Sequence, residues 1–285
     1  MTRKIQFTKM QGVGNDFVLI DNISQNLVLE ASLVRQIADR HFGIGCDQVL
    51  IAEPPSDPEL DFTYRIFNSD GKEVAQCGNG ARCFGRFVYE RGLTDKTLLK
   101  VGTLSGPLSI DISDLSRIQV NMGQPRFDPR AIPLDLTAIT ALEKTARYRL
   151  TLPGLTRDVT VLSLGNPHCV ISVPSVEEAP IAELGKALQN HPAFPAGVNV
   201  SFVQLLARNH IRCRVYERGA KETLACGSAA CAAVIAGILQ AELNPEVKVD
   251  LRGGVLTVNW RSEQPVFLIG PAILVFQGEF SLAKQ

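Results

Sequence analysis

The stretch Phe67-Asn68-Ser69-Asp70-Gly71-Lys72-Glu73-Val74-Ala75-Gln76-Cys77-Gly78-Asn79-Gly80-Ala81 aligns without a gap to Tyr216-Glu217-Arg218-Gly219-Ala220-Lys221-Glu222-Thr223-Leu224-Ala225-Cys226-Gly227-Ser228-Ala229-Ala230. Both copies open on an aromatic residue and share Lys-Glu, Cys-Gly and a later Ala. The copies lie 149 residues apart (226 − 77), a little over half of the 285-residue chain. We therefore interpret the chain as a duplication in which each half presents one Cys-Gly at the start of a helix.

A duplication of this kind has a chemical implication. A pseudo-twofold pair of half-sites can place two equivalent thiols on opposite sides of one ligand. That geometry suits the transfer of a proton from one face of a carbon atom to the other.

Composition places the chain among ordinary globular proteins, with 45% hydrophobic and 20% charged residues. The formal net charge is zero and the pI is about 6.9, without a Lys/Arg run, which argues against nucleic acid or an anionic membrane as the main partner. The segment from Met1 to Lys9 has no signal-peptide apolar core. The longest apolar stretch, Leu224 to Leu239, is short for a membrane span and predicts a buried central helix.

Cysteine usage points to a reducing compartment, and we expect a cytoplasmic protein with free thiols. The count is odd, and no Cys-x-x-Cys occurs. The four histidines form no zinc-ligand spacing with the cysteines, so we expect no metal site. The cysteines are Cys46, Cys77, Cys83, Cys169, Cys213, Cys226 and Cys231.

Hydrophobic periodicity predicts many short strands and few helices. Alternation in 62–66 and 210–216 predicts a strand ahead of each Cys-Gly, and 77–91 and 226–240 then have the character of helices of similar length. Hairpin-like stretches follow at 102–112 and 247–260, and 29–40 has helical spacing. Pro125, Pro129 and Pro133 mark a boundary between halves at about 126/127. The predicted fold class is α+β, with two pseudo-symmetric domains, each a curved, mostly antiparallel sheet or barrel around a central helix.

The two Cys-Gly sites carry the strongest chemical signal. A thiol at a helix N-terminus feels the positive end of the helix dipole, which lowers its pKa from about 8.5. The small residues after Cys77 and Cys226 leave backbone N–H groups open to a carboxylate. Because two such motifs occur in register, we interpret both cysteines as functional. Cys46, Cys83, Cys213 and Cys231 fit small buried core residues.

Two polar sets accompany the cysteines. Asn15 and Asn166 each follow a glycine and lie 151 residues apart (166 − 15), so the pair is expected to contact a ligand. His168 could adjust a nearby thiol, although a lone His is more often structural. Asn68 and Glu217-Arg218 occupy equivalent positions nine residues before each Cys, and this asymmetry predicts a ligand with two different ends. Arg218 could bind a second carboxylate and Glu217 a second ammonium; the alternative is a strand-end salt bridge.

Taken together, these and further motifs resemble the diaminopimelate epimerase family over nearly the whole chain. The matching segments are Met10-Gln11-Gly12-Val13-Gly14-Asn15-Asp16-Phe17, Asp39-Arg40 through Gly43-Ile44-Gly45-Cys46-Asp47-Gln48, Asn68-Ser69-Asp70-Gly71, Cys77-Gly78-Asn79-Gly80-Ala81-Arg82-Cys83, Gly165-Asn166-Pro167-His168, Gly197-Val198-Asn199-Val200 and Glu217-Arg218-Gly219 through Ala225-Cys226-Gly227-Ser228.

The resemblance implies a cofactor-independent epimerase of lysine and peptidoglycan biosynthesis that interconverts LL- and meso-diaminopimelate. It implies that Cys77 and Cys226 are the acid/base residues, and that His168 and Glu217 modulate thiol pKa. It also implies a homodimer, and a last strand, within 272–285, that returns to the domain formed by 1–126, while 127–271 form the second domain. The implied substrate-binding residues are Asn15, Gln48, Asn68, Gly78, Asn79, Asn166, Asn199, Glu217, Arg218, Gly227 and Ser228.

Some positions depart from the usual pattern of the family. Lys72 and Lys221 replace small residues, Tyr216 replaces a common Trp, and Ala229 replaces a frequent Gly. None of these removes an implied catalytic group. Phe276 stands where a Tyr near the dimer interface is typical.

Three alternatives remain open from the sequence. A racemase of another amino acid, such as proline or histidine, could use the same fold, but Arg218, Glu217 and the asparagines favour a distal amino-acid end that proline lacks. A thiol redox protein would consume an oxidant and would not need these asparagines. A non-catalytic amino-acid-binding module would bind its ligand without exchanging the α-proton.

Overall fold

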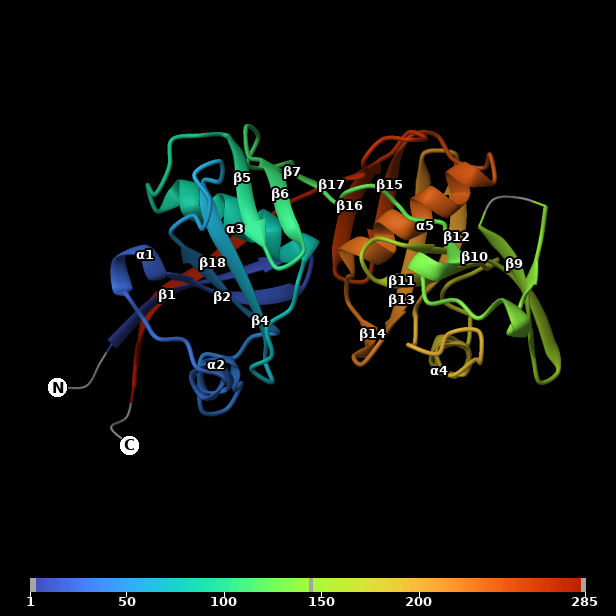
Figure 1. The fold of residues 1–285 in the computed structure, drawn as a ribbon, viewed down its shortest axis with the longest axis horizontal. Coiled ribbons are helices and arrows are strands. Elements are labelled where there is room, and N and C mark those ends of the chain that lie inside the picture. The colour runs from blue at the N-terminus through green and yellow to red at the C-terminus, as the bar shows by residue number, and fades with distance from the viewer. Residues whose placement is uncertain (1–3, 144–145, 283–285) are drawn as a thin grey trace. The chain divides into compact units, whose positions relative to one another are not determined.

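The computed structural model describes residues 4–143 and 146–282, in two compact units. The first unit comprises Met1–Asn121 and Gly270–Gln285, and the second comprises Met122–Ile269. Residues 1–3 and 283–285, which belong to the N-terminal segment and to the predicted returning strand, lie outside the described part. Figure 1 shows the elements of both units.

The first unit is a sheet whose neighbouring strands follow the order β18, β1, β2, β3, β4, β5, β6, β7. All pairs are antiparallel except β2–β3 and β4–β5, which are parallel. The helices of this unit are α1 (Asn22–Gln25), α2 (Ala31–Ala38) and α3 (Gly78–Glu90). The strands are β1 (Lys4–Gly12), β2 (Asn15–Asp21), β3 (Gln48–Glu53), β4 (Phe62–Asn68), β5 (Leu98–Thr103), β6 (Gly106–Asp111), β7 (Ile118–Asn121) and β18 (Ile273–Ser281).

Helix α3 is the central helix of the first unit, and it contacts β1, β2, β3, β6 and β7 (Figure 1). Cys77 is its N-cap, and the helix ends where Gly92 adopts a left-handed backbone, with φ of 67°. Close packing against β6 requires a glycine at position 85, because a Cβ there would lie 2.8 Å from Ile110. Ten of the thirteen residues of the helix are buried.

The second unit repeats this arrangement with the neighbouring order β9, β10, β11, β12, β13, β15, β16, β17. The parallel pairs, β11–β12 and β13–β15, again flank an antiparallel pair. The helices are α4 (Ile181–Gln189) and α5 (Gly227–Leu239), with 3-10 turns η1 (Pro129–Ala131) and η2 (Leu136–Ala138). The strands are β8 (Thr140–Ala141), β9 (Arg147–Leu152), β10 (Leu155–Ser163), β11 (Pro167–Ser172), β12 (Asn199–Ala207), β13 (His210–Glu217), β14 (Lys221–Thr223), β15 (Glu246–Leu251), β16 (Gly254–Asn259) and β17 (Phe267–Gly270).

Helix α5 is the central helix of the second unit and contacts β10, β11, β12, β13 and β16. Its sequence, GSAACAAVIAGIL, is apolar on every side, as expected for a helix surrounded by strands. Residues 122–126 belong to this unit, since Met122 donates its N–H to the Val266 carbonyl and Arg126 pairs with Ser163.

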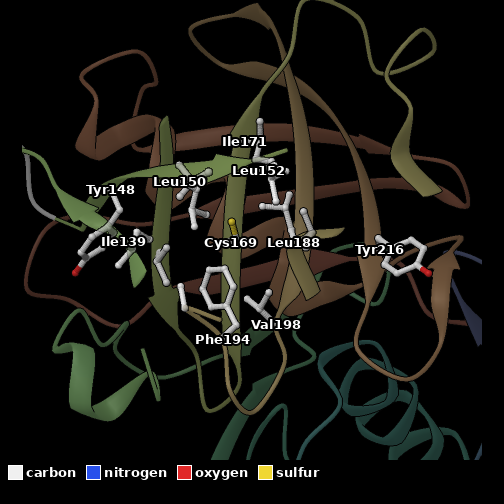
Figure 2. Packing of buried hydrophobic residues seen from close by; sticks show 14 of the residues in the cluster. Ile139, Tyr148, Leu150, Leu152, Cys169, Ile171, Leu188, Phe194, Val198 and Tyr216 are labelled. Carbon is white, nitrogen blue, oxygen red and sulfur yellow. The ribbon is translucent and has the colours of Figure 1, made fainter. Parts of the chain in front are cut away.

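Each unit also carries a helix on the outer face of its sheet. Helix α2 packs on a core that includes Ile5, Val18 and Val49, and α4 packs on a second core. Figure 2 shows this second core, where the Cys169 sulfur lies among apolar side chains that include Leu150 and Phe194. Cys169 is fully buried, so its surroundings are those of a core residue.

The expected fold class, two sheet-dominated domains with few helices, is confirmed. The apolar stretch at 224–239 forms the buried helix α5, while the helix expected at 29–40 is limited to Ala31–Ala38. That helix is shorter because Glu30 is already extended and Asp39 turns the chain away. Helix α4 was not predicted. None of the helices within 4–143 and 146–282 is both long and apolar enough to cross a membrane.

Candidate functional site

The residues singled out from the sequence occupy equivalent element ends in the two units. Gln48 and Asn199 are the first residues of β3 and β12, and Asn68 and Glu217 are the last residues of β4 and β13. Asn15 begins β2, and Asn166 directly precedes β11. Cys77 and Cys226 are the N-caps of α3 and α5. The duplication thus repeats the polar positions together with the strands that hold them.

In the first unit, the thiol of Cys77 lies between the start of α3 and the start of β2. Its Sγ accepts a hydrogen bond from the Gly80 N–H at 3.4 Å, which is an N-cap interaction. Its S–H faces the Oδ1 of Asn15 at 3.8 Å. Cys77 is half-buried, whereas the other six cysteines are buried. Cys77 is therefore the most exposed of the seven cysteines.

Three further polar side chains of this unit lie at element ends: Gln48 begins β3, Asn68 ends β4, and Asn79 is in the first turn of α3. Gln48 Nε2 donates to Asn68 Oδ1 at 2.9 Å, and Gln48 Oε1 is buried without a partner among the described residues. Buried acceptors normally have a partner, so Gln48 is suited to contact a ligand. Asn79 is 2% exposed, and its Oδ1 accepts from Arg82 Nη2 at 2.9 Å.

In the second unit, a hydrogen-bonded series leads to Cys226. His168 Nε2 lies 3.0 Å from Asn166 Oδ1, Asn166 Nδ2 lies 3.5 Å from Ser228 Oγ, and Ser228 Oγ lies 3.5 Å from Cys226 Sγ. Since an amide oxygen only accepts, the His168 Nε2 carries the proton. His168 therefore acts on the amide of Asn166, two hydrogen bonds away from the sulfur.

The imidazole of His168 is uncharged at neutral pH. Burial, and then the positive charge of Arg218, lower the pKa of His168 to about 3. The Nδ1 atom is buried without a partner among the described residues, as expected for a neutral ring that donates only through Nε2.

Glu217 and Arg218 differ in their surroundings. The hydroxyl of Thr223 donates to Glu217 Oε1. Arg218 is exposed, its Nη1 donates to the Ala196 carbonyl at 2.9 Å, and its backbone N–H donates to Asn199 Oδ1 at 2.8 Å. Within the described residues Arg218 forms no salt bridge, unlike the strand-end pair considered from the sequence. Its guanidinium is therefore available to an anion.

The pKa of the Cys226 thiol is raised, whereas a lowered pKa was expected from the sequence. Burial, followed by the negative charge of Glu217, raises the pKa of Cys226 well above its usual value. Hydrogen bonds from Ser228 and from the Ala229 N–H act in the opposite direction but are outweighed. The start of a helix lowers a thiol pKa only if the sulfur stays hydrated, and Cys226 is 8% exposed.

Sequence reasoning missed a group of four charged side chains beside Asn15, which we call the Asp16–Asp47 cluster: Lys9, Asp16, Arg40 and Asp47. Arg40 donates to both oxygens of Asp16, at 3.0 and 2.7 Å, and to Asp47 Oδ1 at 2.8 Å. Lys9 Nζ lies 2.6 Å from Asp16 Oδ2. Although burial raises the pKa of Asp16, the hydrogen bonds from Arg40 and Lys9 lower it to about 2.

A signal for this cluster was present in the sequence. Arg40 and Asp47 belong to the motif between α2 and β3, and Asp16 directly follows Asn15. Their contacts join positions 24 and 31 residues apart, which the order of residues alone does not reveal. Among the described residues, no group of three or more His, Cys, Asp or Glu side chains is arranged to bind a metal ion.

Comparison with known sequences identifies a family match. The sequence model of the family described as diaminopimelate epimerase matches residues 7–127 and 160–275. These segments contain both Cys-Gly motifs and every polar residue discussed above.

Comparison with solved structures shows the same fold in proteins of low sequence identity. A hydroxyproline epimerase from Agrobacterium vitis, with bound trans-4-hydroxy-L-proline, is 14% identical, with a TM-score of 0.70 over 98% of this chain and 93% of its own. A probable proline racemase from Agrobacterium radiobacter is 17% identical, with a TM-score of 0.66 over 96% and 92%. A phenazine biosynthesis protein of the PhzF family from Bacillus anthracis is 17% identical, with a TM-score of 0.66 over 97% and 99%.

Proposed function

The chain belongs to the diaminopimelate epimerase family, and we propose that it interconverts LL- and meso-2,6-diaminopimelate without a cofactor, in lysine and peptidoglycan biosynthesis. The family is one of epimerases, so the chain is an enzyme of the isomerase class. The substrate and the roles of individual residues are the content of the proposal.

One observation carries the proposal: both halves of the chain place a cysteine at the N-cap of their central helix. Each thiol lies next to backbone N–H groups that have no partner within the helix. An anion that binds these groups brings its neighbouring carbon close to the sulfur. The same arrangement, present once in each unit, supplies one proton carrier for each face of a carbon atom.

The proposed reaction needs two proton transfers and no other bond change. One cysteine, as thiolate, removes the Cα proton of the substrate and becomes a thiol. The other cysteine, as thiol, delivers its proton to the opposite face and becomes a thiolate. The helix N–H groups of Gly78-Asn79 and Gly227-Ser228 bind the α-carboxylate and stabilise the negative charge that develops on it.

The side chains around the cysteines fit a substrate with a second amino-acid end. Arg218, which forms no salt bridge among the described residues, would bind the distal carboxylate through two parallel N–H bonds. Glu217 would accept a hydrogen bond from the distal ammonium, and it also raises the pKa of Cys226. Asn15, Gln48, Asn68, Asn166 and Asn199 would complete the contacts.

The proposal is tested by proton NMR of diaminopimelate in D2O with purified protein and no added cofactor. Loss of the α-proton signal is the expected result. An unchanged spectrum with a correctly folded, reduced protein would exclude the reaction. If the signal is lost only after pyridoxal phosphate is added, the cofactor-independent mechanism is wrong.

A second candidate is a racemase of another amino acid, because the solved structures named above include an epimerase of hydroxyproline and a probable racemase of proline. The same NMR assay with proline, 4-hydroxyproline and histidine distinguishes the candidates. Arg218 and Glu217 favour diaminopimelate, since none of these three compounds carries a second carboxylate beside a second ammonium.

Isotope labelling tests the use of two residues rather than one. In D2O the donor thiol exchanges with solvent, so the product gains deuterium at once. The acceptor thiol returns the substrate's own proton to the same face, so recovered substrate stays largely unlabelled early in turnover. Equal early labelling of both pools, measured by mass spectrometry after chiral separation, would indicate a single shared base.

We further propose that the protein is a cytoplasmic homodimer. Phe276 of β18 is 47% exposed, and its ring contacts Phe7 edge-on at 5.9 Å between ring centres. An exposed aromatic residue beside Val275, which is 52% exposed, is suited to an interface between subunits. Light scattering after size-exclusion chromatography would identify a dimer, and Phe276→Lys should then shift the mass toward the monomer.

A further inference from the structure

The orientation of the Asn15 amide is fixed by the Asp16–Asp47 cluster. Asn15 Nδ2 donates to Asp47 Oδ2 at 2.8 Å, and the Asp16 N–H donates to the same oxygen at 3.2 Å. The other oxygen of Asp47 accepts from Arg40 at 2.8 Å. A carboxylate held in this way can only accept hydrogen bonds, so the NH2 end of Asn15 must face it.

This orientation determines what Asn15 presents to the thiol. With its NH2 group directed at Asp47, the amide turns its Oδ1 toward Cys77, at 3.8 Å from Sγ. An amide oxygen can accept from S–H but offers nothing to a thiolate. A hydrogen bond to the neutral form of an acid favours that form.

We infer that Asp47 is a positioning residue that, by orienting the amide of Asn15, holds Cys77 in its protonated state until the substrate binds. In this arrangement Asp47 acts on the sulfur through Asn15, which contacts both groups. Its own position is secured by Arg40 and by its backbone N–H, which donates to Asp16 Oδ1 at 2.9 Å. The inference rests on the proposed function, in which Cys77 carries a proton.

The second unit orients its equivalent amide in the opposite sense. The Nε2–H of His168 donates a hydrogen bond to Oδ1 of Asn166. The Nδ2 of Asn166 is therefore directed at Ser228, whose hydroxyl contacts Cys226. The Asp47 carboxylate orients Asn15 by accepting from its Nδ2, whereas the His168 N–H orients Asn166 by donating to its Oδ1. The two halves therefore share the asparagine but differ in the group that each amide turns toward its cysteine.

The test is the pH dependence of Cys77 alkylation by iodoacetamide, read by peptide mass spectrometry. The reagent attacks thiolate, and Cys77 is the half-buried cysteine while the others are buried. Asp47→Ala frees the amide of Asn15 to turn its NH2 group toward the sulfur. We expect the midpoint of alkylation to fall by about one pH unit, which is about a tenfold gain in thiolate at pH values well below both midpoints.

A double-mutant cycle separates orientation from charge. Removing the Asp47 carboxylate also removes a negative charge, which by itself favours thiolate. In an Asn15→Ala background no amide is left to reorient, so the shift caused by Asp47→Ala should fall to less than half. Asp47→Asn loses the charge but keeps an acceptor oxygen, and it should restore most of the wild-type midpoint. An equal shift in both backgrounds, or no shift in either, would overturn the inference.

The controls keep this result distinct from other causes. Glu59→Gln removes an exposed carboxylate that pairs with Lys100 at 3.2 Å, and it should leave the midpoint unchanged. Asp47 is exposed, with 46% of its side chain accessible, so its substitution should be tolerated, and circular dichroism of each variant verifies the fold. Alkylation requires no substrate. The inference can therefore fail while diaminopimelate turnover is observed, and the reverse is equally possible.

Discussion

Replacing Tyr64 by Phe should stabilise the protein, although Tyr64 is among its most deeply buried residues. Tyr64 lies on β4 and is 1% exposed. Its ring packs against that of Phe84, with 4.5 Å between the two ring centroids. Its hydroxyl is buried without a hydrogen-bond partner among residues 4–143 and 146–282. Burial, and then the neighbouring thiols of Cys77 and Cys83, raise the pKa of Tyr64 well above its usual value, so the hydroxyl keeps its proton.

The size of the effect follows from the cost of an unpaired buried hydroxyl, about 1–3 kcal/mol. Phe retains the ring and its contact with Phe84, so we expect Tyr64→Phe to raise the free energy of unfolding by about that amount. Urea denaturation at equilibrium measures it. Tyr89→Phe is the matched control because Tyr89 is 40% exposed, and it should change the free energy by less than about 0.5 kcal/mol.

A neighbouring glycine provides an independent check. A Cβ at Gly80 would lie 2.5 Å from the Tyr64 hydroxyl oxygen, too close for any stable contact. Gly80→Ala should therefore destabilise the wild type by about 1–3 kcal/mol, and by clearly less in the Tyr64→Phe background, where the oxygen is gone and Leu50 Cδ1, 3.3 Å from the added Cβ, is the nearest atom. If Tyr64→Phe instead lowers stability, or if Gly80→Ala costs the same in both backgrounds, the assigned position of the hydroxyl is wrong.

Three further predictions concern residues of the candidate site. Replacing either Cys77 or Cys226 by Ala should lower kcat by at least about 10²–10⁴-fold in the NMR assay, because each change removes the proton carrier on one face; near-normal turnover in either variant would contradict the two-base mechanism. Arg218→Lys should reduce kcat/KM for diaminopimelate by about 10-fold or more, since Lys cannot form two parallel bonds to a carboxylate; unchanged kinetics would make Arg218 structural. Because burial lowers the pKa of His168 to about 3, the unfolded chain takes up its proton more readily below pH 6.5, and stability should decrease as the pH falls from 6.5 toward 3. Denaturation midpoints over this range should depend less on pH in His168→Gln, and equal slopes would argue against a buried neutral imidazole.

Much of the fold could be predicted because the relevant patterns are local. The alternation of Phe62, Tyr64 and Ile66 identifies β4, and the uniformly apolar run after Cys226 identifies a helix buried on all sides. The internal repeat related the two units without any three-dimensional information. Helix α4 was missed although Ile181 and Leu188, both buried, are seven residues apart, which is the spacing of one face of a helix.

The site was less accessible from sequence wherever its chemistry depends on burial or on long-range contacts. Nothing in the sequence shows that His168 is fully enclosed, and enclosure is what keeps it neutral. The raised pKa of Cys226 likewise comes from burial rather than from its position at a helix start. The contact between Asn15 and Asp47 joins residues 32 apart, so periodicity carries no trace of it.

The pairing of β1 with β18 makes synthesis on the ribosome a two-stage process for this chain. Lys4 and Glu279, which form an ion pair at 2.6 Å, are separated by 275 residues. The second unit is continuous in sequence, so all its strands are translated, and leave the ribosome, ahead of β18. It can fold while the first unit still exposes the edge of β1, and that open edge can pair with other nascent chains until β18 arrives.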